Sequence, residues 1–243
     1  MSSRDAYEIW HAQAGPDLPV ARTPWHRLVL AHLDVAHDLA GKRVLEIGCG
    51  RGGFLCSLAL NAPEPLPSFF GIDYAQNAVA QARALARDQG CAKIDFAVGD
   101  IQAIAHPDAT FDTVISCETI EHVPDPGAAL GELARVLRPG GKLFLTTPNY
   151  LGPMGLYRLY LRIRGRRYTE VGQPINHFTM LPRTLIWVKR AGLKVQATDG
   201  VGHYLLLPRR APRRLPSLDR MSVVTRWVAL HSIVVAVKPP GAI

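Results

Sequence analysis

Apolar positions along the chain follow two different spacings in alternation. Short apolar runs rich in β-branched residues predict strands, and stretches with an apolar residue every three to four positions predict the helices between them. Parallel βαβ units have this arrangement, because a helix must return the chain to the starting edge of the sheet. The predicted strands are 43–47, 68–73, 93–100, 111–117, 142–148, 193–200 and 232–239.

Capping residues locate the helices between these strands. Thr23 and Pro24 are typical of a helix N-terminus, and this helix is expected to run to Gly41. Further helices are predicted at 53–60, 75–90, 127–137 and 181–192, with a turn at 138–141.

The alternation is interrupted twice, by insertions at 150–180 and 201–230. The first contains a basic amphipathic segment, GLYRLYLRIRGRR, and the second a predicted helix at 217–230. Two insertions in an otherwise regular α/β pattern indicate one domain with added segments.

The loop after the first strand, in VLEIGCGRGGFL at 44–55, fits two cofactor fingerprints. One is the dinucleotide pattern Gly48-x-Gly50-x-x-Gly53, and Asp73 follows Gly53 by 20 residues, where that pattern places its ribose-binding carboxylate. The other is the pattern of enzymes that bind S-adenosylmethionine, which begins at the last acidic residue of the strand. A glycine motif alone does not separate them.

Glu46 favours S-adenosylmethionine. A carboxylate two residues before Gly48 repels a pyrophosphate, whereas S-adenosylmethionine has no phosphate and carries a cationic amino group and a sulfonium. Asp100, at the end of the third strand, is placed to accept a hydrogen bond from an adenine amino group beside Ile101. The chain also has only one set of parallel strands, without room for the second domain of a typical dehydrogenase.

Four segments carry a family resemblance: VLEIGCGRGGF, FFGIDYAQNAVAQAR, VGDIQAIAHPDATFDTVISCETIEHVPDP and ELARVLRPGGKLFLTTPN. Over about residues 42–149 the chain resembles class I S-adenosylmethionine-dependent methyltransferases, in the group that includes ubiquinone- and menaquinone-biosynthesis enzymes (methyltransferase types 11 and 23). The resemblance implies a Rossmann-like seven-stranded α/β sheet of order 3-2-1-4-5-7-6, flanked by helices, with strand seven antiparallel. Residues 232–239 fit strand seven.

The resemblance also implies the cofactor contacts. Glu46 and the backbone from Gly48 to Gly52 would hold the methionine end together with the Cys117 carbonyl, and Asp73 would bind the ribose hydroxyls. The full set of expected cofactor residues is Glu46, Gly48, Cys49, Gly50, Gly52, Asp73, Tyr74, Asp100, Ile101 and Cys117.

One domain over 1–243 follows from this resemblance. Residues 1–41 would form N-terminal cap helices, 42–149 the cofactor-binding core, and 150–180 and 201–230 substrate-side insertions. Because both insertions leave the sheet at its carboxyl edge, where ligands bind in this fold, they are expected to roof the active site.

Methyl transfer to a hydroxyl is an in-line displacement that also needs a proton acceptor, for which histidine is suited near neutral pH. His122 and His177 are the candidate catalytic residues, and His177, His203, Tyr157 and Arg158 are the candidate substrate contacts. The remaining histidines of the N-terminal part are expected on the surface or in packing: His11, His26, His32 and His37.

The expected function is therefore methylation of a small-molecule or lipid- or sugar-linked acceptor, at a hydroxyl. N- or C-methylation, RNA-directed methylation and S-adenosylmethionine binding without catalysis remain open alternatives. The group's fold does not decide among them.

The net charge of +8 is unevenly distributed. Residues 1–149 hold 12 Lys and Arg against 17 Asp and Glu, whereas 150–231 hold 15 against 3. A solvated face, recognition of an anionic acceptor, and docking to an anionic membrane all fit the Arg-rich insertions. Nucleic acid is a weaker expectation, because CETIEH occupies the place of the Asn/Asp-Pro-Pro-Tyr/Phe motif of nucleic-acid amino-methyltransferases.

The four cysteines show no metal-binding spacing, so no metal is expected. The longest apolar run near the C-terminus, 227–237, is shorter than the roughly 20 residues of a spanning helix. With no apolar segment near Met1, a cytoplasmic protein is expected, peripheral at the inner face of the membrane through its basic insertions.

Overall fold

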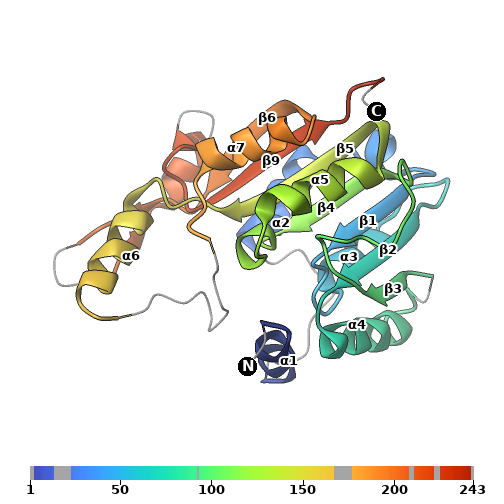
Figure 1. Ribbon diagram of the computed structural model, residues 1–243, viewed down its shortest axis with the longest axis horizontal. Coiled ribbons are helices and arrows are strands. Elements are labelled where there is room, and N and C mark those ends of the chain that lie inside the picture. Colours follow the sequence, from blue (N-terminus) through green and yellow to red (C-terminus); the bar gives the residue numbers. More distant parts are fainter. Residues whose placement is uncertain are drawn as a thin grey trace.

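A computed structural model describes residues 3–13, 23–91, 93–166, 177–207, 211–221 and 225–241. Its centre is a seven-stranded sheet of order β3-β2-β1-β4-β5-β9-β6 (Figure 1). The strands are β1 Arg43–Ile47, β2 Ser68–Asp73, β3 Asp95–Val98, β4 Phe111–Cys117, β5 Leu137–Pro148, β6 Lys194–Val201 and β9 His231–Val237.

The sheet confirms the order expected from the sequence. Strands β1 to β5 pair in parallel, while β9 runs antiparallel to both β5 and β6. Strand β9 therefore starts at the edge where the parallel strands end, and His231 lies opposite Pro148 and Val201 there.

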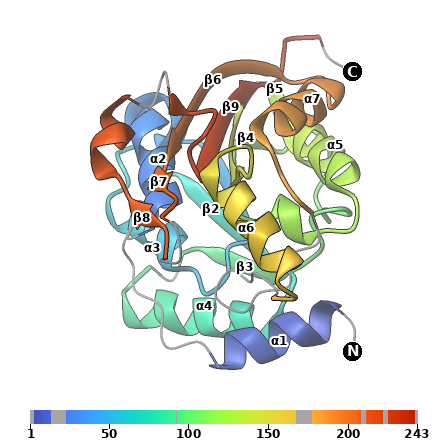
Figure 2. The same cartoon turned by 90° about the vertical axis from the view of Figure 1, so that its left-hand side faces the viewer.

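Helices cover both faces of the sheet (Figure 2). Helices α2 (Pro24–His32), α3 (Gly53–Leu60) and α4 (Gln76–Asp88) bury one apolar cluster, which includes Val29, Leu55 and Ala82. Helices α5 (Pro126–Val136) and α7 (Leu181–Arg190) bury a second cluster on the other face.

Two helices lie outside this three-layer body. Helix α1 (Ser3–Gln13) runs beside α4, and α6 (Pro153–Ile163) projects away from the sheet (Figures 1 and 2). The smaller elements are the π-helical turn Val35–Leu39, the 3-10 turns Ile120–His122 and Pro216–Met221, and a ribbon of β7 (Tyr204–Leu205) with β8 (Arg213–Arg214). Among the described residues, no helix is long and apolar enough to cross a membrane.

The prediction of one helix over 23–41 is wrong. Helix α2 ends at His32, and Asp34 begins a separate π-helical turn by accepting hydrogen bonds from the amides of Ala36 and His37. Asp38 in that turn is buried and ion-paired with Lys142 at 2.7 Å. Local side-chain capping and this tertiary contact therefore end the helix early.

Two further boundaries differ from the prediction. Strand β5 already begins at Leu137, and its register with β4 shifts between Phe111 and Thr113, so the expected turn at 138–141 forms an irregularity within the strand. The expected helix at 217–230 is instead a 3-10 turn that ends at Met221, followed after the undescribed residues by a short turn from Thr225.

Asp219 explains the short turn. Its carboxylate accepts hydrogen bonds from the Gly202 amide and from Arg214, and it pairs with the His203 ring. Two of these partners, Gly202 and His203, lie 17 and 16 residues earlier in the chain, and such partners compete with a regular helix.

Candidate active site

A cavity of about 460 Å³ opens at the carboxyl edge of the sheet. This volume lies in the range of about 300–1,000 Å³ that small-molecule sites occupy. The ends of β1, β2 and β4 supply its floor, as the topology of an open α/β sheet requires. The floor residues include Glu46, Gly48, Cys49, Gly50, Asp73, Tyr74, Asp100, Ile101, Gln102, Cys117, Glu118 and Thr119.

Gly48 makes the sharp turn out of β1. Its φ of +74° is in the left-handed region, and a β-carbon there would lie 2.1 Å from Thr119 Oγ1. The amides of Gly48 and Cys49 both donate to the Ile72 carbonyl, at 2.7 and 3.0 Å. The loop is thus fixed against β2 and passes too close to Thr119 for any side chain.

Asp73 connects the Gly loop to the end of β2. One carboxylate oxygen accepts from the Gly50 amide at 2.8 Å and the other from the Ala75 amide at 3.0 Å. Burial raises the pKa of Asp73, although these amides and the nearby His11 oppose the rise. The carboxylate is therefore held rigidly between the Gly loop and the start of α4.

The electrostatics of the cavity floor are acidic. Glu46 is 2% exposed at the end of β1. Burial, then Glu46 and to a smaller extent Glu118 and Glu121, raise the pKa of the Cys117 thiol well above its usual value. Such surroundings fit a cationic ammonium and sulfonium and oppose a pyrophosphate. The residues present thus fit S-adenosylmethionine.

One expected cofactor residue does not line the cavity. Gly52 caps α3 with a φ of +81°, and a β-carbon on it would lie 2.9 Å from Ala82 and 3.0 Å from Phe96. Its role is close packing of the loop against α4 and β3. Gly50, by contrast, lies at the cavity and faces His11, with 3.8 Å between its β-carbon position and that ring.

The described residues that cover the cavity come from α1 and α2, whereas the basic insertions were expected to roof it. The covering residues are Tyr7, Trp10, His11, Thr23, Trp25 and His26. The side chain of His26 stacks on Phe54 with 4.2 Å between ring centroids. His11 and His26, which were expected on the surface or in packing, both line the cavity, and His26 also packs on Phe54. The aromatic spacing Tyr7, Trp10, His11 on one helical face was the sequence signal that could have identified this cover.

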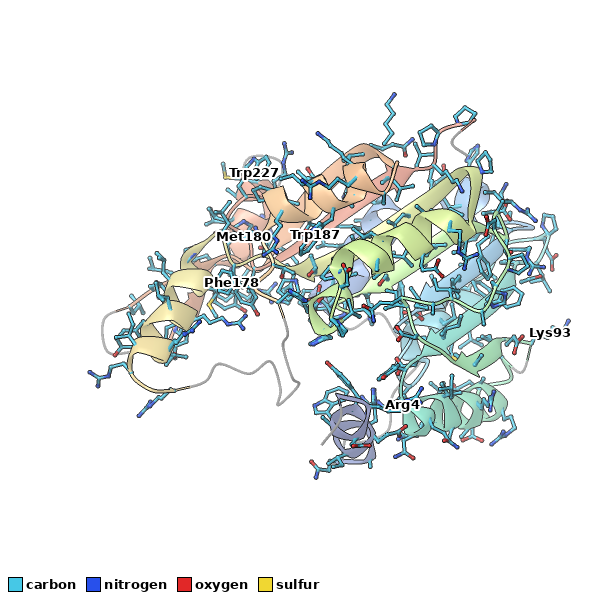
Figure 3. All side chains as sticks on the ribbon, viewed as in Figure 1. Arg4, Lys93, Phe178, Met180, Trp187 and Trp227 are labelled. Atoms are coloured by element: carbon cyan, nitrogen blue, oxygen red, sulfur yellow. The ribbon has the colours of Figure 1, made fainter. Side chains whose placement is uncertain are left out.

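Helix α1 is attached to the body through the first turn of α4. The Glu8 carboxylate accepts hydrogen bonds from the amides of Gln76 and Asn77, at 2.6 and 2.9 Å. No side chain of α4 itself caps these amides. Arg4 adds a contact to Tyr74, both to its carbonyl and over its ring, and lies on the side of α1 that faces α4 (Figure 3).

Loss of this attachment should weaken cofactor binding. A carboxylate that caps a helix N-terminus contributes about 0.5–2 kcal/mol, so Glu8→Ala is expected to raise the dissociation constant for S-adenosylmethionine about twofold to 30-fold. Calorimetric titration measures this. Asp88→Ala, at the other end of α4, is the matched control and should bind as the wild type does; equal binding by Glu8→Ala would contradict a closing role for α1.

The candidate histidines lie in different places. His122 lines the cavity, with its ring edge-on to Tyr7 at 5.7 Å and its Nε2 3.6 Å from Glu121 Oε1. Burial, followed by the Glu121 and Asp73 carboxylates, raises the pKa of Tyr7, so its hydroxyl remains protonated.

His177 and His203 are not among the residues that line the cavity. The His177 ring contacts the Pro124 carbonyl at 3.1 Å and its amide donates to the Glu121 carbonyl, so His177 supports the loop that carries His122. His203 is buried between Asp219 and the Thr225 carbonyl, where it holds the second insertion together.

Tyr157 and Arg158 also lie away from the described cavity lining. Tyr157 packs against an apolar cluster with Tyr150, and the Arg158 guanidinium lies over the rings of Tyr150 and Phe178, at 4.5 and 5.1 Å from their centroids. Arg167 and Tyr168 of the first insertion and Arg209 and Arg210 of the second lie outside the described residues. Within the described parts of the chain, no group of three or more His, Cys, Asp or Glu is arranged to hold a metal ion.

Comparisons with known proteins agree with the geometry. A family model described as a methyltransferase domain matches residues 45–145. The ubiquinone biosynthesis O-methyltransferase of Xanthomonas euvesicatoria pv. vesicatoria is 33% identical over 215 residues, which cover 86% of this chain and 84% of that protein. The 27-O-demethylrifamycin SV methyltransferase of Amycolatopsis mediterranei is 32% identical over 169 residues, covering 68% of this chain and 58% of that enzyme.

Solved structures share the fold. The methyltransferase in a complex with the Haloferax volcanii Trm112 methyltransferase activator has a TM-score of 0.66 and 23% identity, covering 98% of both chains. An S-adenosylmethionine-dependent methyltransferase from Mesorhizobium loti has a TM-score of 0.62 and 17% identity, covering 89% of this chain and 98% of that one.

The sheet order, the Gly loop and the acidic cavity define a class I S-adenosylmethionine-dependent methyltransferase. Within that class, the chain belongs to the group of methyltransferases that resembles the ubiquinone-biosynthesis O-methyltransferases.

Proposed function

We propose that the protein transfers a methyl group from S-adenosylmethionine to a hydroxyl oxygen of a small aromatic acceptor. The observation that carries this proposal is a cavity that combines the acidic floor with aromatic rings from α1 and α2. Oxygen is favoured as the methylated atom because the named relatives are O-methyltransferases.

The proposed residue roles follow from position. Glu46 and the Gly48–Gly50 backbone hold the amino acid end of S-adenosylmethionine, Asp73 its ribose, and Asp100 with Ile101 its adenine. When bound, this molecule supplies a methyl group on a positively charged sulfur. The protein aligns the acceptor with that methyl and excludes water.

An aromatic acceptor suits the remaining wall. Trp10, Trp25, His26 and Phe54 also line the cavity. Planar rings stack on such side chains and bury apolar area there. A hydroxylated ring is therefore the proposed acceptor class.

The proposed activity is tested with S-adenosylmethionine carrying a carbon-13 methyl group and a panel of phenols, catechols, anilines and indoles. The expected product has the carbon-13 signal of a methyl ether. A labelled methyl on nitrogen or ring carbon would contradict O-methylation, and bound cofactor without any labelled product would favour a protein that binds but does not transfer.

The proposal extends to an anionic membrane surface that presents a lipid-linked acceptor to this cytoplasmic protein. Helix α6 supports it, because Leu156, Leu159, Tyr160 and Ile163 are between 50% and 75% exposed on it. The exposed Arg162, Arg164 and Arg166 lie on the same segment. Exposed apolar residues together with arginines are typical of helices that lie in the membrane interface.

Vesicle binding tests this extension. The wild-type protein is expected to co-sediment with phosphatidylglycerol vesicles and not with phosphatidylcholine vesicles, and a Leu156→Glu/Ile163→Glu double variant is expected to lose about tenfold or more of that binding, since each buried apolar side chain contributes about 1.5–3 kcal/mol. Leu60→Glu, at the exposed end of α3, is the control. Retained binding by the double variant would contradict a role for α6.

A further inference from the structure

Glu118 occupies a strained position at the cavity. It directly follows β4, and its φ of +48° places a non-glycine residue in the left-handed region. Its amide donates to the Thr146 carbonyl at 3.0 Å, which fixes the backbone to β5. Strain of this kind costs about 1–3 kcal/mol and persists where the surroundings impose it, commonly at functional sites.

The Glu118 carboxylate is held from one side only. Oε2 lies 3.0 Å from Nδ1 of His231, and both side chains are 11% exposed. Oε1 is buried and has no hydrogen-bond partner within the described structure, although Glu118 lines the cavity. A buried carboxylate oxygen without a partner is costly, which indicates that a ligand donor completes it.

His231 is placed by the sheet itself. It is the first residue of β9, where that antiparallel strand meets the carboxyl edge beside β5. The ring of Trp25, which lines the cavity, lies 5.0 Å from the His231 ring. Three elements distant in sequence therefore bring an acid and a histidine together beside the aromatic wall.

We infer that Glu118 is the general base that takes the proton of the acceptor hydroxyl, and that His231 is the positioning residue that orients its carboxylate. The inference rests on the proposed O-methylation. It assigns to Glu118 the role of proton acceptor, which was expected of His122 or His177. The nucleophile–base–orienter arrangement is the one that activates hydroxyl nucleophiles in other enzymes.

The step balances as follows. One bond forms, between the acceptor oxygen and the methyl carbon, and one breaks, between that carbon and sulfur, which keeps the electron pair and becomes neutral. The hydroxyl proton passes to Glu118 Oε1, so the carboxylate becomes a neutral acid as the cationic sulfur loses its charge. His231 donates from Nδ1 to Oε2 and holds Oε1 toward the cavity.

The other ionisable groups near this edge are engaged elsewhere. Glu121 is fully buried and accepts a hydrogen bond from Thr147 through Oε2. His122 faces Glu121 and Tyr7, and His26 stacks on Phe54. Glu46 lies at the end of β1, at the methionine end of the proposed cofactor position.

The test compares catechol with nitrocatechol as acceptors, because the nitro group leaves a hydroxyl already ionised in mildly alkaline buffer and removes the need for a base. Glu118→Gln is expected to lower kcat for catechol about 100-fold or more and to affect nitrocatechol by less than about tenfold. Its affinity for S-adenosylmethionine should stay within about threefold of wild type.

Two further variants separate positioning from folding. His231→Ala should lower kcat for catechol, and His231→Gln, which still donates a hydrogen bond to the carboxylate, should recover part of it. Asp199→Asn is the matched control, because it breaks a histidine–carboxylate pair with His32 outside the cavity lining and should leave both acceptors unaffected.

A binding measurement without turnover completes the test. With S-adenosylhomocysteine present, absorbance titration of bound nitrocatechol should give a higher pKa in wild type than in Glu118→Gln, because a carboxylate beside the hydroxyl disfavours the phenolate. If Glu118→Gln lowers kcat equally for catechol and nitrocatechol, or if bound nitrocatechol has the same pKa in wild type and variant, the role of Glu118 is overturned and O-methylation still stands. If the wild-type protein methylates neither acceptor at oxygen, both the role of Glu118 and the proposed O-methylation are overturned.

Discussion

Gly48→Ala is expected to abolish useful cofactor binding, raising the dissociation constant for S-adenosylmethionine about 100-fold or more. An alanine there would place its β-carbon 2.1 Å from Thr119 Oγ1 and would adopt a φ of +74°. The loop and Thr119 must then move apart, and loss of about 2.8 kcal/mol of loop contacts with the cofactor corresponds to about 100-fold in the dissociation constant. Calorimetric titration of the purified variant measures the change.

Gly90→Ala is the control that separates the effect of backbone strain from the effect of the contact with Thr119. Gly90 has nearly the same φ, +73°, but nothing lies within 4 Å of its β-carbon position. Both substitutions should lose about 1–2 kcal/mol of stability from left-handed strain, and only Gly48→Ala should lose binding. A Gly48→Ala/Thr119→Ala double variant should recover part of the affinity. Wild-type binding by Gly48→Ala would contradict the proposed place of the loop.

Glu46→Gln is expected to weaken S-adenosylmethionine and S-adenosylhomocysteine alike, by about tenfold to 100-fold. The carboxylate is 2% exposed at the end of β1, and a hydrogen bond to a charged group contributes about 1.5–3 kcal/mol. Both molecules carry the same amino group, so both should lose the same contact. Stability should change little, because the amide has the same shape and removes a buried charge.

Glu132→Gln provides the control for Glu46→Gln. Glu132 is bonded to Arg135 and to the Ile104 amide outside the cavity lining. Loss of the Glu132 charge should weaken these contacts and lower the melting temperature without changing the affinity for S-adenosylmethionine. Unchanged affinity in Glu46→Gln would contradict the assignment of Glu46 to the methionine end.

The sheet and its cofactor edge were predictable because local signals and topology agree there. The β-branched strands, the Gly loop and the strand-end carboxylates Glu46, Asp73 and Asp100 are each visible over a few residues. In a parallel sheet, strand ends meet at one edge, so short motifs already determine which residues come together. The antiparallel β9 followed from its β-branched sequence and the family order.

The cavity cover was not predictable in the same way. Glu8 caps a helix that begins 68 residues later, and Asp219 meets His203 from 16 residues away within the second insertion. Such contacts depend on tertiary docking and leave no periodic signal. The pairing of Glu118 with His231 spans 113 residues and follows only from strand order. Histidines were therefore ranked by their expected place after a strand or an insertion at the carboxyl edge, which favoured His177 and His203 over His26 on the leading helix.

The most direct test is calorimetric titration of the full chain with S-adenosylmethionine and, separately, with NAD. A single molecule of S-adenosylmethionine bound per chain and no heat from NAD is the predicted result, because the acidic floor around Glu46 accepts a cation and repels a pyrophosphate. Binding of NAD without binding of S-adenosylmethionine would contradict the assignment of this cavity.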